Sequence, residues 1–100
     1  MEPGRIRHTV SFTLRHAPGS DEERAFLAAA AELGRIAGVE AFEVLAEVSP
    51  KNDFRFGLSM EFASQSAYDG YNNHPDHVSF VQDRWLNEVS DFLEIDYAPL

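Results

Sequence analysis

Tyr71, His74 and His77 are the residues whose types and spacing best suit chemistry on a small molecule. Histidine takes up and releases a proton near neutral pH, and a tyrosine hydroxyl can hold or protonate a carbonyl oxygen. Tyr71 and His74 are three residues apart, so they share a helix face if the helix extends that far. His77 falls in the first turn after Pro75, where the helix dipole disfavours imidazolium. A neutral general base is therefore expected at His77.

A second histidine, His8, lies on the apolar side of the strand predicted over residues 6–14. We expect it to point toward the same helices as His77 and to form, with Tyr71, a small acid–base pocket. In that pocket Tyr71 and His77 are the candidate catalytic residues, and His8 binds or orients the ligand. The alternative interpretation is a core in which each of these side chains is hydrogen-bonded and no ligand is bound.

His74, Asp76 and His77 also have the spacing of a rival metal site, with two imidazoles and an oxygen from one turn. Pro75 makes the two histidines diverge, however, and no clear third ligand is close in sequence. The sequence also lacks a glycine-rich phosphate loop, a G-x-S-x-G elbow and a dinucleotide fingerprint. We therefore predict no metal and no cofactor.

Hydrophobic periodicity predicts the elements that position these residues. Apolar residues alternate with polar ones where strands are expected, and recur at helical spacing elsewhere. Ser20 and Glu23 form a capping box at the start of the first helix, and Gly38 follows its end. Strands are predicted over residues 6–14, 42–48, 54–62 and 93–97, and helices between Ser20 and Gly38, from Ser64 or Ser66 through Tyr71, and from Pro75 to Val89.

The order of these elements predicts an α+β protein with a ferredoxin-like, split βαβ antiparallel sheet and helices on one face. Residues 1–100 form a single domain, with its core over about 5–98. The face without helices is polar, and it faces water or pairs with a second copy, arginine against glutamate. We expect the homodimer. The residues assigned to this face are Arg7, Thr9, Ser11, Arg55, Ser59, Glu61 and Glu94.

The composition limits the classes of partner. The 17 acidic and 8 basic residues give a net charge of −9, which disfavours nucleic acid and anionic membranes as partners. The absence of cysteine excludes disulfides and thiolate chemistry. The longest apolar run, Ala25 to Ala31, is far shorter than the ~20 residues of a membrane helix. With no apolar leader at the start of the sequence, the default expectation is a cytoplasmic protein.

Several motifs together resemble the stress-responsive A/B barrel (Dabb) family over about residues 5–98. The resemblance is carried by Ile6-x-His8-x-Val10-x-Phe12, Gly38-Val39-x-x-Phe42, Phe62, Tyr71-x-x-His74-Pro75-x-His77 and Asp96-Tyr97. It implies a ferredoxin-like monomer and a dimeric α+β barrel. The family is functionally mixed and includes a plant polyketide cyclase. The catalytic tyrosine and histidine of that cyclase correspond to Tyr71 and His77, and a pocket histidine to His8. Another of its pocket histidines is replaced here by Phe56.

Two functions are therefore expected as alternatives. The first is a stress-responsive homodimeric barrel of unassigned activity, whose apolar pocket, lined by histidine and tyrosine, binds a small apolar or carbonyl-containing ligand. Its ligand-binding residues are expected to be His8, Phe56, His74 and Trp85. The alternative is a cofactor-free enzyme, resembling a polyketide cyclase or an isomerase, that uses Tyr71 and His77 for proton transfer.

Overall fold

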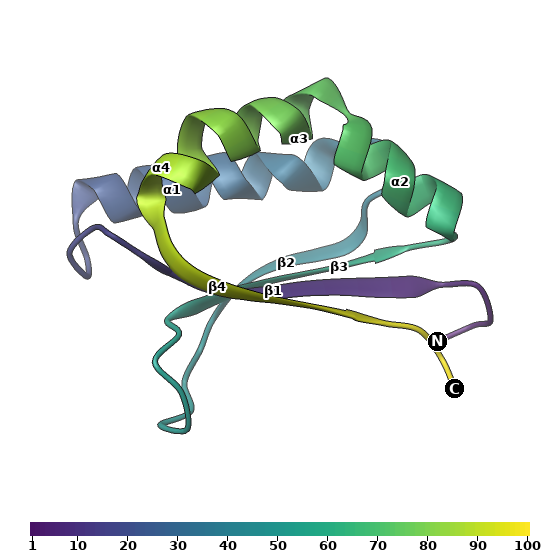
Figure 1. Cartoon of the computed structure of the whole chain (residues 1–100), viewed down its shortest axis with the longest axis horizontal. Coiled ribbons are helices and arrows are strands. Elements are labelled where there is room, and N and C mark those ends of the chain that lie inside the picture. The colour runs from purple at the N-terminus through teal and green to yellow at the C-terminus, as the bar shows by residue number, and fades with distance from the viewer.

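The computed structural model describes residues 1–100, and it contains one antiparallel sheet with helices on one face (Figure 1). The strands are β1 (Ile6–Leu14), β2 (Glu40–Ala46), β3 (Phe56–Phe62) and β4 (Val89–Tyr97). The helices are α1 (Asp21–Ala31), the 3₁₀ turn η1 (Glu32–Arg35), α2 (Gln65–Asn73), α3 (Pro75–Phe80), the π-helical η2 (Val81–Trp85) and α4 (Leu86–Glu88). The strand order β2-β3-β1-β4 is that of the split βαβ arrangement, so the predicted fold class is confirmed.

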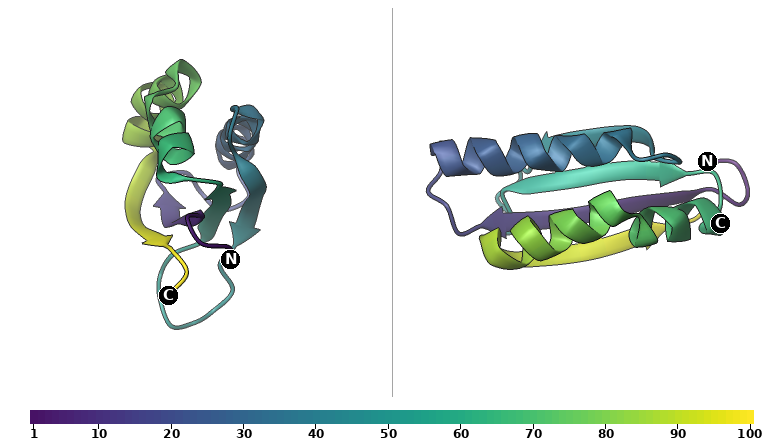
Figure 2. Two further views of the ribbon diagram at one scale, coloured as in Figure 1. Left: turned by 90° about the vertical axis from the view of Figure 1, so that its right-hand side faces the viewer. Right: turned by 90° about the horizontal axis from the view of Figure 1, so that it is seen from above.

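The helices form two rows above the sheet (Figure 2). One row is α1, which lies over β2 and β3, and the other is the series from α2 to α4, which lies over β1 and β4. Alternate side chains of β1 and β3 are buried beneath them, as the period-two pattern predicts. The most deeply buried large side chains are Tyr71, Phe12, Phe26, Phe62 and Met60. No helix of the chain combines the length and the apolar character needed to cross a membrane.

Serine side chains begin the two helices that follow turns. The Ser20 hydroxyl accepts a hydrogen bond from the Glu23 amide at 3.2 Å, and the Glu23 carboxylate accepts one from the Gly19 amide at 3.0 Å. The serine half of the predicted capping box is confirmed, whereas the glutamate accepts from Gly19 and not from the amide of Ser20, which bonds to the Ala17 carbonyl. Ser64 caps α2 in the same way, accepting from the Ala67 amide at 3.1 Å. Its position fixes where α2, and with it Tyr71, lies over the sheet.

The sequence predicts one apolar stripe in the helical segment after Pro75, made of Val78, Val81, Trp85 and Val89, and the structure departs from it at its two ends. Val78 is exposed, Phe80 is buried in its place, and Val89 begins β4 instead of ending the helix. The π-helical turn η2 takes more residues per turn, so it shifts the side chains that follow it, from Leu86 onward, around the helix axis. The last turn consequently presents a different set of side chains to the sheet from the stripe that the sequence predicted.

β4 turns its glutamate toward the helices and its aliphatic residues away from them. The strand register pairs Leu93, Ile95 and Tyr97 with Ser11, Thr9 and Arg7, on the face without helices. Glu94 pairs with the buried Val10 and therefore lies on the helix side, so its predicted place on the outer face is wrong. Polar and apolar residues do not alternate cleanly over residues 92–95, so the sequence does not show which face of β4 the helices cover. β4 is also an edge strand, with a single neighbouring strand to fix its orientation.

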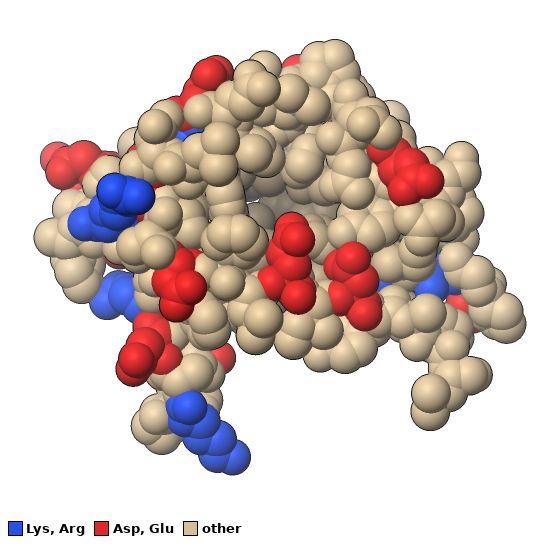
Figure 3. Space-filling view, viewed as in Figure 1, with Lys and Arg blue, Asp and Glu red and all other residues tan.

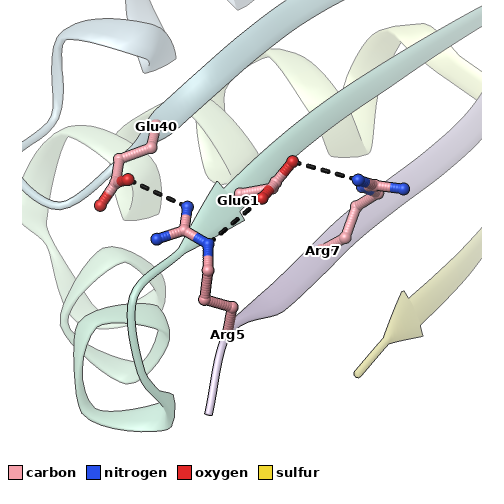
Figure 4. Close-up of polar contacts among 4 residues, drawn as sticks. All are labelled: Arg5, Arg7, Glu40 and Glu61. Atoms are coloured by element: carbon pink, nitrogen blue, oxygen red, sulfur yellow. Dashed lines mark hydrogen bonds and ion pairs between the residues drawn. The ribbon is translucent and has the colours of Figure 1, made fainter. Parts of the chain in front are cut away.

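Arginines near the start of β1 form ion pairs within the chain (Figure 4). Arg7 is 3.2 Å from Glu61, and Arg5 bridges Glu61 at 3.3 Å and Glu40 at 2.9 Å. Arg55, also assigned to the outer face, instead approaches Glu23 of α1 at 3.6 Å. Glu61, which was expected to pair with an arginine of a second copy, is thus already paired within the chain. The outer face also carries the exposed apolar residues Leu45, Leu93, Ile95 and Tyr97, so it is less polar than predicted.

Candidate functional site

A pocket of about 300 Å³ lies between the sheet and the helices that follow α2. This volume is at the lower end of the about 300–1,000 Å³ typical of ligand sites. Its walls are mostly apolar, and they include His8, Tyr71, His77 and Trp85. The space-filling view shows the molecule hollowed between the helices and the sheet edge, with acidic side chains along the lower rim (Figure 3). Four of the six predicted site residues are thus brought together.

His77 lies in the first turn of α3 with its ring against Tyr71, the two ring centres being 4.4 Å apart. Its Nδ1 is 3.1 Å from the carbonyl oxygen of Asn72, which can only accept a hydrogen bond. Nδ1 therefore carries the proton in the neutral ring, and Nε2 keeps its lone pair. Burial lowers the pKa of His77, while the Asn72 hydrogen bond opposes this effect. The sequence predicted the direction of the shift, but the leading cause is desolvation.

Tyr71 is only 2% exposed, yet its hydroxyl makes no hydrogen bond to the chain. Burial, reinforced by the negative charge of Glu94, raises the pKa of the phenol well above its usual range. The hydroxyl is consequently protonated at neutral pH and is available as a donor. The hydroxyl is not among the fully buried polar atoms that lack a partner, so it is reached from the pocket, where a ligand or water can supply the acceptor.

His8 is fixed by two side chains, those of Asp96 and Tyr68, for which the sequence predicts no role. Its Nδ1 is 2.6 Å from Oδ1 of Asp96 and 2.9 Å from the hydroxyl of Tyr68. The Tyr68 hydroxyl donates to Oδ2 of Asp96 at 2.9 Å, so its oxygen is free to accept from Nδ1–H. These contacts leave Nε2 of His8 without a partner in the chain. The sequence contains a signal for Tyr68, because it precedes Tyr71 by three residues and therefore lies on the same helix face, toward the pocket.

His74 and Phe56 lie outside the pocket. Nδ1 of His74 accepts a hydrogen bond from the Asp76 amide at 3.1 Å, so this side chain caps α3. The Phe56 ring is half-buried and packs against Phe12, with ring centres 5.7 Å apart. Neither residue contributes to the wall that His77 and Tyr71 share.

A pH titration checks the environment of His77. Its pKa is expected below the ordinary value of 6.5 because the folded chain favours the neutral ring. Between the folded and unfolded pKa values the unfolded chain binds more protons. This contribution to stability is therefore present above pH 6.5 and is lost as the pH falls through the folded pKa. The measurement is the NMR shift of the His77 ring proton against pH, and a midpoint at or above 6.5 would contradict the expectation.

The fold and the site define an α+β, ferredoxin-like domain with a pocket lined by histidine and tyrosine. Residues 6–99 match the model of Dabb, the stress responsive A/B barrel domain, and the chain belongs to this family. A Mesorhizobium loti protein described as a Dabb family protein with a ferredoxin-like fold is 61% identical. The alignment covers 97% of this chain and 98% of that one, with a TM-score of 0.94.

More distant structures share the fold alone. A dimeric Bacteroides fragilis protein of unknown function is 22% identical, with 96% of this chain and 97% of that chain covered and a TM-score of 0.72. A hydroxynitrile lyase from Passiflora edulis is 14% identical, with coverage of 99% and 96% and a TM-score of 0.85. Comparison with curated proteins gave no match.

Proposed function

We propose that the pocket binds a small, largely apolar carbonyl compound, and that Tyr71 and His77 transfer a proton next to its carbonyl group. The observation that carries this proposal is the Tyr71 hydroxyl, which makes no hydrogen bond within the chain, belongs to a residue of the pocket wall and lies beside the His77 ring. A carbonyl oxygen supplies the missing acceptor. No cofactor is needed, because the step requires a donor, a base and a site that excludes water.

Each side chain has a distinct part in this reaction. Tyr71 donates its hydrogen bond to the carbonyl oxygen and stabilises the negative charge that develops there. His77 removes a proton from the adjacent carbon with Nε2, while Asn72 holds the other ring nitrogen. His8, fixed by Asp96, orients the ligand from the sheet side of the pocket. The lowered pKa of His77 keeps the base neutral at pH 7.

Deuterium exchange into phenylacetone tests the proposal without knowledge of the natural substrate. This ketone combines an apolar ring with an acidic C–H next to a carbonyl. In D₂O the protein is expected to accelerate replacement of that hydrogen by about 10²–10⁴-fold, the usual contribution of a positioned general base. NMR loss of the proton signal measures the rate. If the ketone binds but exchanges no faster than in buffer, the chain is a binding module without this chemistry.

We also propose that two copies associate through the outer face of the sheet. Related structures from Bacteroides fragilis and Thermobifida fusca are described as dimeric. In this chain, Leu45, Leu93, Ile95 and Tyr97 are each at least 40% exposed on that face. Burying such side chains against a second copy removes apolar surface from water, and a two-fold axis makes one face complementary to itself.

The connection between β2 and β3 supports the same interface. It extends beyond the sheet on the side away from the helices (Figure 1). Val48, at its start, is 90% exposed. The loop is held in shape by its own polar groups, with Glu47 accepting hydrogen bonds from the Ser49 amide and the Asn52 side chain. A preformed apolar projection on the outer side fits contact with a second copy.

Replacing Ile95 with lysine is expected to separate the copies. A charge placed in the centre of an apolar interface loses its hydration. The free-energy cost of this desolvation exceeds the stabilisation that the contact between copies provides. Sedimentation of the wild type should give about twice the chain mass of 11.2 kDa, and the variant the chain mass itself. Val78→Lys is the matched control, because Val78 is equally exposed, at 40%, but lies on α3. A monomeric wild type at micromolar concentration would contradict this interface.

A further inference from the structure

We infer that Glu94 makes the pocket favour cationic ligands, and neutral ligands with a hydrogen-bond donor, over carboxylates. This inference rests on the proposed function, since it assigns the chemical class of the ligand. Glu94 is the only acidic residue in the pocket wall, and the wall contains no lysine or arginine. Its carboxylate therefore sets the sign of the local potential.

Glu94 differs from the other carboxylates around the site because no side chain neutralises it. Asp96, two residues further along the same face of β4, is engaged by His8 and Tyr68. Glu88 is paired with His16 at 2.7 Å and with Arg84 at 3.2 Å. Glu94 makes no ion pair or side-chain hydrogen bond, and its charge is felt by both Tyr71 and His77.

The place of Glu94 in the fold puts its charge at the pocket entrance. β4 is an edge strand, and Glu94 is exposed while its pairing partner Val10 is 4% exposed at the base of the pocket. The hollow in Figure 3 opens beside this edge, with acidic side chains along it. A ligand that reaches Tyr71 with its carbonyl oxygen thus has its outer end near a carboxylate.

The charge acts on ligands in two ways. An ammonium or hydroxyl group at the outer end of the ligand gains a charge-assisted hydrogen bond from Glu94. A carboxylate at the same place meets a like charge in a partly enclosed, apolar site, where screening by water is reduced. The chain as a whole adds to this preference, since its net charge of −9 repels anions at longer range.

Fluorescence of Trp85 provides the test, because it is the sole tryptophan and it lines the pocket. The probes are 2-phenylethylamine, 2-phenylethanol and phenylacetate, which share an apolar ring and differ in charge at neutral pH. The amine is expected to bind about tenfold more tightly than the alcohol, a difference of about 1.4 kcal/mol, and phenylacetate more weakly than either. Glu94→Gln should remove the advantage of the amine and strengthen phenylacetate.

Glu22→Gln is the matched control, because it removes the same charge from an exposed position in the first turn of α1, outside the pocket. It should leave the order of the three probes unchanged. If the alcohol binds but charge makes no difference, or if Glu94→Gln leaves the order intact, the role of Glu94 is wrong while the pocket proposal stands. If none of the probes binds, this inference fails, while deuterium exchange into phenylacetone decides the pocket proposal separately.

Discussion

Replacing His77 with alanine is expected to return deuterium exchange into phenylacetone to its rate in buffer. The loss should be about 10²–10⁴-fold, because the positioned base disappears. The reason lies in the geometry around the ring. The Asn72 carbonyl fixes the proton on Nδ1, burial keeps the ring neutral, and Tyr71 lies against it at a ring-centre distance of 4.4 Å. No other group in the chain combines these three properties.

Three further variants make this result interpretable. His77→Gln retains a polar side chain of similar size. It is expected to lose the exchange activity while its unfolding curve stays unchanged, which would show that the loss comes from the missing base and not from unfolding. His16→Ala removes a histidine that pairs with Glu88 outside the pocket, and it should leave the exchange rate unchanged. Tyr71→Phe is expected to lower the rate by about 10²–10³-fold through loss of the hydrogen bond to the developing oxyanion. Full exchange in His77→Gln would show that another group is the base.

Local sequence patterns were sufficient for most of the fold. The alternation in residues 6–14 identified β1 and placed His8 on its buried side, since a period of two depends on the strand alone. The serine half of the capping box at Ser20 was equally local, because its partners are three residues apart. The apolar stripe predicted for the last helix is wrong at Val89, because that prediction also depended on a regular local period. A π-helical turn between Val81 and Trp85 breaks the 3.6-residue period on which the predicted stripe depended.

The candidate site was only partly predictable because its remaining parts come from pairs that are distant in sequence. Tyr71 and His77 are six residues apart, and their motif identified them. Asp96 reaches His8 across 88 residues, through the β1–β4 pairing. The same register decides that Glu94 faces the pocket and Ile95 the outside. A shift of one residue exchanges these two faces, and nothing in the composition of an edge strand determines which of them the helices cover.

Replacing Phe12 with alanine is expected to lower the free energy of unfolding by about 3–5 kcal/mol. The Phe12 side chain is fully buried on the central strand β1. Its ring centre lies 5.7 Å from those of Phe26 and Phe56, and 5.2 Å from that of Trp85. Removing it opens a cavity at the point where both rows of helices contact the sheet. Since the free energy of unfolding of a small domain is about 5–15 kcal/mol, this substitution is expected to remove a large part of it.

Phe56→Ala is the comparison that tests this explanation, because Phe56 belongs to the same aromatic cluster but is half-buried. Solvent can fill part of the space it leaves, so its cost is expected to be about 1–2 kcal/mol, below the range for a fully buried phenylalanine. Urea unfolding followed by circular dichroism measures both values. Equal losses would mean that Phe56 is as deeply packed as Phe12 in solution, through a contact between two copies of the chain. Running the Ile95→Lys monomer in parallel checks this cause, since a contact between copies disappears with the dimer.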